Sequence, residues 1–267
     1  MADKQLYTDM FANAVHIGSH RSHWSPKMRD FIHSEQNGIH VFDLVKTAQH
    51  LEQTKKALEE FCKAGNELII VGTKVQAQQY ARDLASESGH HVVASVWVPG
   101  LLTNWSTIKR RIKEFNELVK DIETGKMDEL SKKEKAMAMI RFNRLRKRYE
   151  GIKDLKRKPD GILVLDGRYD RLAIEEANRA GIKIFALLGT TGVPDLCDHF
   201  IPGNVNNIKS LNFFADQLRP VIKRVARAEK PRPGFKKPEK KESGVRSQES
   251  EAAAEAPAKK TEEKAES

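Results

Sequence analysis

Four short apolar segments, alternating with helical patterns, constrain the fold of this chain more than any other feature. They are rich in β-branched residues and comprise Glu67–Gly72 (ELIIVG), His91–Ser95 (HVVAS), Gly161–Asp166 (GILVLD) and Lys183–Leu188 (KIFALL). Continuous apolar runs of this length are typical of parallel strands buried on both faces of a sheet. The sequence therefore predicts an α/β domain with a doubly wound parallel sheet.

Helical patterns connect these strands. Val75–Ser86 is followed by Gly89, and Arg171–Ala180 is followed by Gly181, in the position where glycine ends many helices. A last amphipathic helix is expected to close the domain, with its apolar face made by Ile208, Leu211, Phe214, Leu218, Ile222 and Val225.

The alternation stops between Leu102 and Lys153. Two helical segments take its place, Trp105–Thr124 and Ser131–Tyr149, and Gly125 lies in the connection between them. Each segment has apolar residues three or four positions apart, which gives it one apolar face. We expect an antiparallel helical hairpin, inserted at residues 103–153.

Positive charge is concentrated on this hairpin. The whole chain has 47 basic and 37 acidic residues, and residues 106–150 alone hold 14 basic and 8 acidic ones. Cations at this density repel one another unless a polyanion neutralises them, which favours RNA over a merely solvated helical face, the alternative reading. The cations predicted to bind RNA are Lys109, Arg110, Arg111, Arg141, Arg144, Arg146 and Arg148.

The last forty residues have a different composition. Residues 228–267 contain 10 basic and 9 acidic side chains, and only Phe235 and Val245 are large and apolar. Such a segment cannot bury enough apolar surface to offset the entropy lost on folding. We expect an α/β domain over residues 1–227 and a disordered charged tail over residues 228–267.

The N-terminal region mixes basic and aromatic residues. Arg21, Lys27 and Arg29 surround Trp24, a combination that suits RNA. The nearby histidines match no metal-ligand spacing, so no metal site and no cofactor is expected; they are His16, His20, His23, His33 and His40. Cys62 and Cys197 are far apart and outside any C-x-x-C motif, which indicates reduced thiols and a cytoplasmic protein. No run approaches the ~18 apolar residues of a membrane span.

Two strand ends offer alternative chemistry. Val71–Lys74 places a glycine, a hydroxyl and a lysine between a strand and a helix, where Lys74 would contact an RNA phosphate or lie in an ordinary turn. Asp166 ends another strand, so a nucleotide-dependent α/β enzyme using Val71–Lys74 and Asp166 is the second hypothesis. Asp195 and Asp198 are catalytic candidates of the same standing as Asp166. A coiled-coil adaptor that binds protein is the third hypothesis.

Several motifs, in order across residues 7–225, resemble the bacterial protein-two family of the small ribosomal subunit. They include Ala14–Gly18 (AVHIG), Trp24–Met28 (WSPKM), Asn37–His40 (NGIH), Asp43–Thr47 (DLVKT), Val71–Lys74 (VGTK), Gly100–Trp105 (GLLTNW), Ser131–Glu134 (SKKE), Gly151–Asp154 (GIKD), Ala173–Ala177 (AIEEA) and Ile201–Asn204 (IPGN).

The resemblance implies a non-catalytic protein with a Rossmann-like or flavodoxin-like domain and a protruding coiled-coil hairpin. It implies binding to small-subunit ribosomal RNA near the junction of head and body, and a role in assembly and translation. The expected partners are that RNA, neighbouring small-subunit proteins and, where an organism has it, the messenger-binding ribosomal protein one. Neither a membrane nor a homo-oligomer is expected. Asn104, from the GLLTNW motif, joins the predicted RNA-binding set.

Four positions depart from the family pattern. Val96–Gly100 (VWVPG) replaces Arg-Trp-Leu-Gly-Gly, which removes a cation and stiffens the loop with a proline. Gly189–Thr191 replaces Asp-Thr-Asn, Val205 replaces an acidic residue, and Ser19 replaces a common histidine. Any metal bridge that those side chains form in relatives is therefore not expected here.

Overall fold

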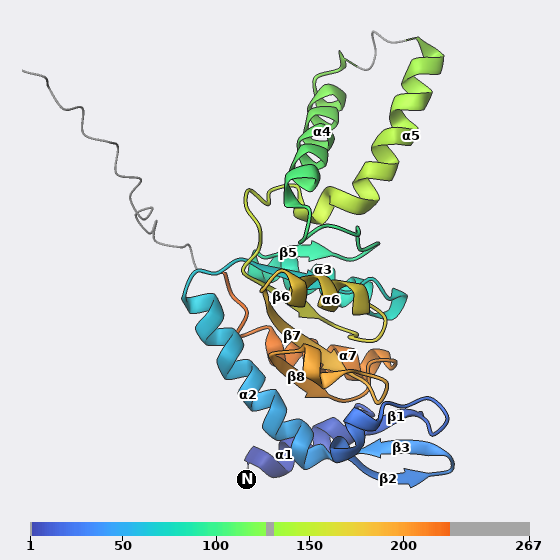
Figure 1. The fold of residues 1–267 in the computed structure, drawn as a ribbon, viewed down its shortest axis with the longest axis vertical. Coiled ribbons are helices and arrows are strands. Elements are labelled where there is room, and N and C mark those ends of the chain that lie inside the picture. Colours follow the sequence, from blue (N-terminus) through green and yellow to red (C-terminus); the bar gives the residue numbers. More distant parts are fainter. Residues whose placement is uncertain (1, 127–130, 225–267) are drawn as a thin grey trace, which may run out of the picture. The chain divides into compact units, whose positions relative to one another are not determined.

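The computed structural model describes residues 2–126 and 131–224 (Figure 1). Its centre is a parallel sheet in the order β5-β4-β6-β7-β8. The strands are β4 (Leu68–Val71), β5 (His91–Val93), β6 (Gly161–Val164), β7 (Lys183–Leu188) and β8 (His199–Pro202). The chain crosses from β5 back past β4 to β6, so the strand order reverses between β4 and β6. This is the flavodoxin-like form of the doubly wound sheet, and the predicted fold class is confirmed.

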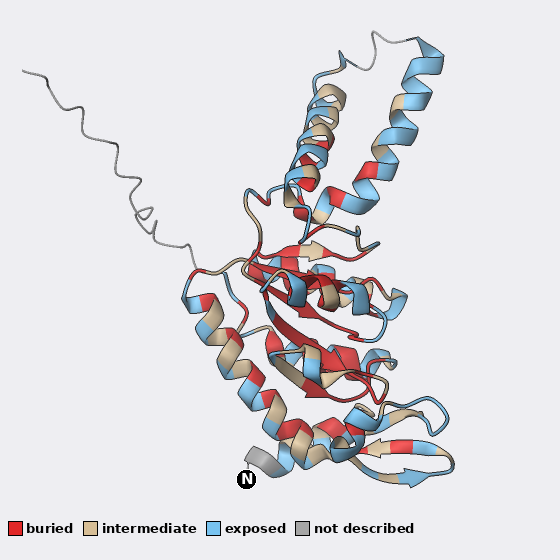
Figure 2. Ribbon diagram, viewed as in Figure 1, coloured by how far each residue is buried: buried red, intermediate tan, exposed pale blue. Residues whose placement is uncertain are grey.

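Helices cover both faces of the sheet. One face packs against α2 (Leu44–Lys63), α3 (Val75–Ser88) and α7 (Ile208–Leu218), and α1 (Ala2–Ala12) joins this layer. The other face packs against α6 (Arg171–Arg179) and the base of the hairpin. Every residue of β4 and β6 is buried, as Figure 2 shows by the red strands at the centre. Burial on both faces explains why these strands are apolar throughout instead of alternating.

The predicted hairpin lies between β5 and β6. It consists of α4 (Trp105–Glu123) and α5 (Lys132–Tyr149), and the short 3-10 helix η3 (Glu150–Ile152) leads back to the sheet. Near the base the two helices pack tightly, with the rings of Phe115 and Phe142 stacked at 5.9 Å. Farther out, Met137 and Ile140 are 65% and 61% exposed, and the helices diverge (Figure 1). The hairpin is present, but coiled-coil packing along its length is not confirmed.

A small antiparallel sheet, which the sequence analysis did not predict, forms the N-terminal region. Its strands are β1 (Ile17–His20), β2 (Ile32–Gln36) and β3 (Ile39–Phe42), in the order β1-β3-β2, and η1 (Pro26–Phe31) lies in the β1–β2 connection. Asn37 and Gly38 both have positive φ, +50° and +76°, as the tight turn between β2 and β3 requires. Arg21 and Trp24 lie in the loop between β1 and η1, and Lys27 and Arg29 lie in η1, so these residues belong to the connection that joins two strands of this sheet.

Several boundaries differ from those expected. The second strand ends at Val93 instead of Ser95, and α7 ends at Leu218, although Ile222 beyond it is still buried. Helix α2 and strand β8 were not predicted. The proposed tail, residues 228–267, and its boundary lie outside the described residues. Within residues 2–126 and 131–224, no helix is long and apolar enough to cross a membrane.

Candidate nucleic-acid interface

All seven predicted hairpin cations are exposed. On α4 the buried residues Ile108, Ile112 and Phe115 face the core, which leaves Lys109, Arg110 and Arg111 on the outer side of the helix. On α5 only Leu145 and Tyr149 are buried, so the four predicted arginines in the second half of this helix also point to solvent. These are Arg141, Arg144, Arg146 and Arg148.

Three of these seven cations have acidic partners on the hairpin. Glu114 of α4 accepts a hydrogen bond from Arg111 at 2.8 Å and another from Arg141 of α5, so it links the two helices. These two bonds lower the pKa of the Glu114 carboxyl. Arg146 forms an ion pair with Glu150 at 3.1 Å.

The other four hairpin cations are not neutralised by the protein. Within the described part of the chain, no carboxylate comes within 4.0 Å of the charged groups of Lys109, Arg110, Arg144 or Arg148. The unpaired cations at the base of the hairpin repel one another. Binding of a polyanion to this surface would offset that repulsion.

The N-terminal set forms a second surface, on the connection between β1 and β2, at the opposite end of the central sheet from the hairpin (Figure 1). Arg21 forms an ion pair with Glu35 at 3.4 Å, and Lys27 pairs with Asp195. The Trp24 ring is tilted over His40 at 5.2 Å and remains 36% exposed. The hairpin cations and the N-terminal residues thus form two separate groups, and Arg21 and Lys27 of the second group are already paired.

Lys74 has an internal role that the sequence analysis did not predict. Its Nζ lies 2.7 Å from Oδ2 of Asp166 and 3.1 Å from the carbonyl oxygen of Val205, and it also contacts Asn206. The carboxylate of Asp166 is almost fully buried, and its Oδ1 accepts backbone N–H bonds from the turn after β6. Lys74 therefore ties the ends of β4 and β6 to the segment after β8.

A nucleotide-dependent enzyme, the second hypothesis, would use the carboxyl end of the sheet between β4 and β6, where the strand order reverses. Ligands of doubly wound proteins commonly bind there. Here Lys74 and Asp166 neutralise each other, and both Thr73 N–H and Thr73 Oγ1 donate to Asp170. Burial raises the pKa of Asp170, while the bonds from Thr73 oppose that shift. The polar groups available for a nucleotide are engaged in contacts with one another.

The divergent loop Val96–Gly100 is held by a buried carboxylate. Glu176 of α6 is only 5% exposed and accepts bonds from Trp97 Nε1 at 3.2 Å, Gly100 N at 2.8 Å and Leu102 N at 3.3 Å. Asn104, just beyond, is exposed at the start of α4 and makes no capping bond. The role of Glu176 was not predicted, although this acid lies in the AIEEA motif, between Ile174 and Ala177 on the apolar face of a helix.

The residues at the other positions that depart from the family pattern make neutral contacts. The backbone N–H of Ser19 donates to Thr190 Oγ1 at 3.0 Å, and the Val205 side chain is buried. Among the described residues, no three His, Cys, Asp or Glu side chains come together as a metal site. His16 stacks on Phe11 at 4.4 Å, and burial lowers its pKa. The region is thus held together by packing and neutral hydrogen bonds.

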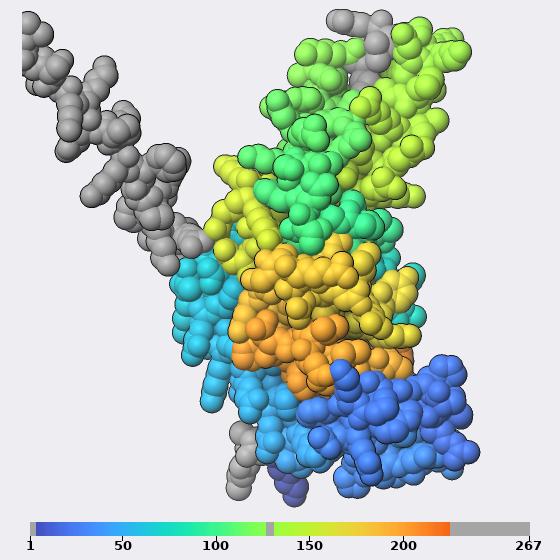
Figure 3. Space-filling view, viewed as in Figure 1, coloured from blue at the N-terminus to red at the C-terminus, as the bar shows by residue number. Residues whose placement is uncertain are grey.

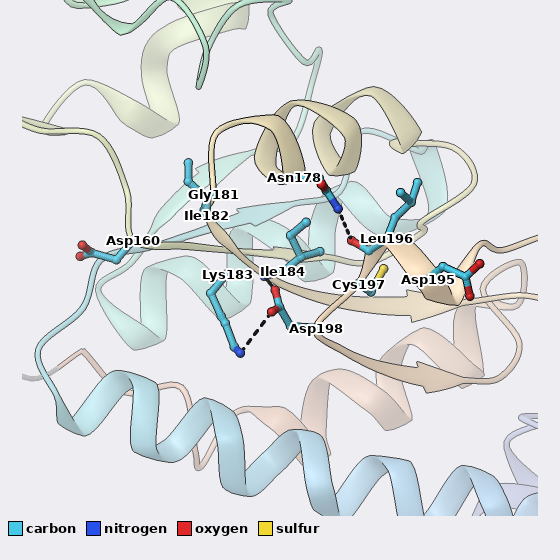
Figure 4. A pocket seen from close by; sticks show the side chains of 10 residues that line it. All are labelled: Asp160, Asn178, Gly181, Ile182, Lys183, Ile184, Asp195, Leu196, Cys197 and Asp198. Carbon is cyan, nitrogen blue, oxygen red and sulfur yellow. Dashed lines mark hydrogen bonds and ion pairs between the residues drawn. The ribbon is translucent and has the colours of Figure 1, made fainter.

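A polar pocket of about 450 Å³ lies at the amino-terminal end of β7 (Figure 4). Its lysine, Lys183, is 3.2 Å from Asp198, whose other oxygen accepts the N–H of Ile184 at 2.8 Å. Burial raises the pKa of the Cys197 thiol to about 12, so this thiol stays protonated and is a poor nucleophile. The pocket contains no evident catalytic arrangement.

Comparison with known proteins is consistent with these features. The family described as Ribosomal protein S2 matches residues 10–224. A small ribosomal subunit protein uS2 of Thermus thermophilus is 36% identical over 214 residues, which are 80% of this chain and 84% of that protein. The uS2 of Fusobacterium nucleatum is 37% identical over 209 residues, 78% and 85% of the two chains. The uS2c of Guillardia theta is 36% identical over 210 residues, 79% and 89%.

Proposed function

The chain belongs to the ribosomal protein S2 family, and from this premise we propose that the hairpin cations bind the phosphate backbone of small-subunit ribosomal RNA. As a member of that family it is a structural, non-enzymatic constituent of the small ribosomal subunit. It works in the cytoplasm as part of the ribosome, in association with ribosomal RNA and other ribosomal proteins. Our proposal concerns the residues that contact the RNA.

One observation carries the proposal: Lys109, Arg110, Arg144 and Arg148 are exposed without an acidic partner in the described residues. Contacts from such side chains to phosphates position a protein on RNA without reading its sequence. Arg111, Arg141 and Arg146 are expected to add to the same surface once RNA competes with Glu114 and Glu150.

A second, weaker contact is proposed for Arg21, Trp24 and Lys27 in the connection between β1 and β2. Because Arg21 and Lys27 are already paired with Glu35 and Asp195, RNA gains less from them than from the hairpin. Asn104 is proposed to contact RNA where α4 begins. Lys74 is left out of the proposed surface because its ammonium group is committed to Asp166.

We further propose that residues 103–153 act as an RNA-contacting arm of a domain spanning residues 1–227. The RNA would be that at the junction of head and body of the subunit, as the family resemblance implies. The messenger-binding ribosomal protein one is proposed as a neighbour on the same ground. A pull-down with purified protein one would test that contact directly, and no retention would contradict it.

The RNA-binding proposal is tested by replacing Arg144, Arg146 and Arg148 together with alanine. Affinity for small-subunit ribosomal RNA should fall roughly tenfold or more, and the dependence of log affinity on log salt should lose about two to three units of slope. Filter binding over a salt series measures both quantities.

The matched control replaces Lys4, Lys56 and Arg179, three exposed cations on the body, with alanine. The two triple variants change the net charge equally, so a loss specific to the hairpin isolates its contacts from the effect of charge alone. Equal losses in both variants, or binding by the original chain that does not depend on salt, would contradict the proposal.

A further inference from the structure

A basic groove of about 740 Å³ lies at the base of the hairpin, between α4 and residues 153–156. Six cations from these two segments line it: Lys109, Arg110, Lys113, Lys120, Lys153 and Lys156. Only the first two of them belong to the RNA-binding set predicted from the sequence. Lys113 and Lys120 lie on α4, and Lys153 and Lys156 join them because the segment after η3 folds back along α4, as the space-filling view shows at the lower end of that helix (Figure 3).

Specific contacts hold the two walls of the groove together. Asn116 of α4 donates its side-chain N–H to the carbonyl oxygen of Lys153 at 3.0 Å. Leu155 is 3% exposed and packs into the core beneath the groove, while its backbone N–H donates to Ile152 at 3.0 Å. The backbone that carries Lys153 and Lys156 is therefore fixed opposite α4, and the groove does not depend on a loose loop.

The groove has a strong excess of positive charge. Its lining includes only two carboxylates, Glu117 and Asp154, against the six cations. Glu117 is 3.6 Å from Lys113, and both side chains are largely exposed, so solvent screens that pair. A net charge of about +4 in one groove favours an extended anion that can meet several cations at once.

The geometry also indicates what kind of anion fits. Lys109, Lys113 and Lys120 lie on one side of α4, and at 1.5 Å rise per residue they extend over about 16 Å. A single small anion cannot contact cations along that length. None of the described residues that line the groove is aromatic, so stacking with unpaired bases has no partner among them.

We propose that this groove binds the sugar-phosphate backbone of an RNA strand, with Lys113, Lys120, Lys153 and Lys156 contacting its phosphates. The inference rests on the proposed function of the hairpin and deepens it by defining the path of the strand. Because the contacts are to phosphates, the groove orients the protein on its RNA without selecting a sequence.

The test replaces Lys113, Lys120, Lys153 and Lys156 with glutamine in the full chain. If four phosphate contacts are lost, the slope of log affinity against log salt should fall by about three units, measured by filter binding with small-subunit ribosomal RNA between about 50 and 200 mM salt. The control replaces four exposed lysines of the body, Lys4, Lys56, Lys209 and Lys223, with glutamine and should leave the slope nearly unchanged.

A second variant distinguishes the loss of phosphate contacts from misfolding of α4. Replacing only Lys153 and Lys156, which lie outside the helices, should lower the slope by about half as much as the fourfold variant does.

If both groove variants keep the slope of the original chain, the groove does not bind RNA, although the hairpin proposal stands. If the original chain itself shows no salt dependence, both proposals fail. If RNA affinity is kept but co-sedimentation with the subunit is lost, the groove holds an acidic protein segment, and the RNA inference is overturned.

Discussion

Single buried polar side chains decide how the loops around the hairpin are held. Glu176 is the strongest case, since one carboxylate accepts three N–H groups from the segment Trp97–Leu102. In the family pattern this loop carries a cation and two glycines, and here it carries Val96 and Pro99. The carboxylate fixes this altered loop through two of its backbone N–H groups and the Trp97 indole.

Replacing Glu176 with alanine should lower the free energy of unfolding by about 3 kcal/mol, because three donors lose their acceptor inside the protein. Urea unfolding followed by circular dichroism measures the loss. The neighbouring Glu175, which pairs with Arg171 at 2.7 Å on the surface, is the control, and its replacement with alanine should cost less than about 1 kcal/mol. Equal costs for the two variants would show that the loop does not depend on Glu176.

A buried histidine should make the stability sensitive to acid. His90 is 7% exposed and contacts Cys62 Sγ at 3.6 Å, and burial, with the nearby Arg224 charge, lowers its pKa to about 4. In the unfolded chain the pKa is near 6.5, so at lower pH the unfolded state takes up a proton that the folded state does not. Stability should therefore be complete above about pH 6.5 and fall towards pH 4, by up to about 3 kcal/mol.

Chemical unfolding at a series of pH values checks this expectation. The His90→Gln variant removes the titrating group and should flatten that part of the profile, whatever its stability at neutral pH. A profile with the same slope in both proteins would assign the acid sensitivity to other groups.

At the level of elements, the two hairpin helices begin in different ways. Helix α5 starts with a capping box, in which Ser131 and Glu134 satisfy each other's backbone N–H groups. Helix α4 starts at Asn104, whose side chain caps nothing. Phe115, Phe142 and Leu145 hold the pair together only near the base, so the start of α5 depends more on local interactions than the start of α4.

The Ser131→Ala substitution should weaken the first turn of α5 by about 1 kcal/mol, which corresponds to roughly fivefold faster amide exchange there. Hydrogen exchange measured by mass spectrometry resolves this segment. Asn104→Ala should leave exchange in the first turn of α4 nearly unchanged. If both substitutions have the same effect, the capping box does not stabilise the hairpin.

For the whole molecule, the two proposed RNA-contacting surfaces lie at opposite ends of the central sheet and share no residue (Figure 1). Energetic effects at sites that are far apart and have no common partner usually add. One double variant carries Arg21→Ala and Lys27→Ala, and the other carries Arg144→Ala and Arg148→Ala. The quadruple variant that combines them should lose binding free energy equal to the sum of the losses of the two double variants, within about 0.5 kcal/mol. Filter binding at one salt concentration measures the three losses, and a deviation well beyond 1 kcal/mol would mean that the surfaces act as one.

The sequence by itself determined four of the five strands of the central sheet, the helices α3, α6 and α7 and the charged hairpin, because these depend on local periodicity. Lys183–Leu188 was predicted residue for residue, and the hairpin helices within a residue of their ends. Helix α2 was missed because threonines occupy two of its buried positions, Thr47 and Thr54, and interrupt the apolar pattern. The strands β1, β2 and β3 were missed because they are short and half-exposed.

Only the tertiary structure decided which charged groups are free to bind RNA. Lys74 and Asp166 are 92 positions apart, and Glu176 is 76 positions from Gly100, so no local pattern could pair them. The same holds for the basic groove, where Lys153 and Lys156 come opposite α4 through the fold of the segment after η3. Periodicity reports on neighbours along the chain, whereas the neutralisation of a charge depends on neighbours in space.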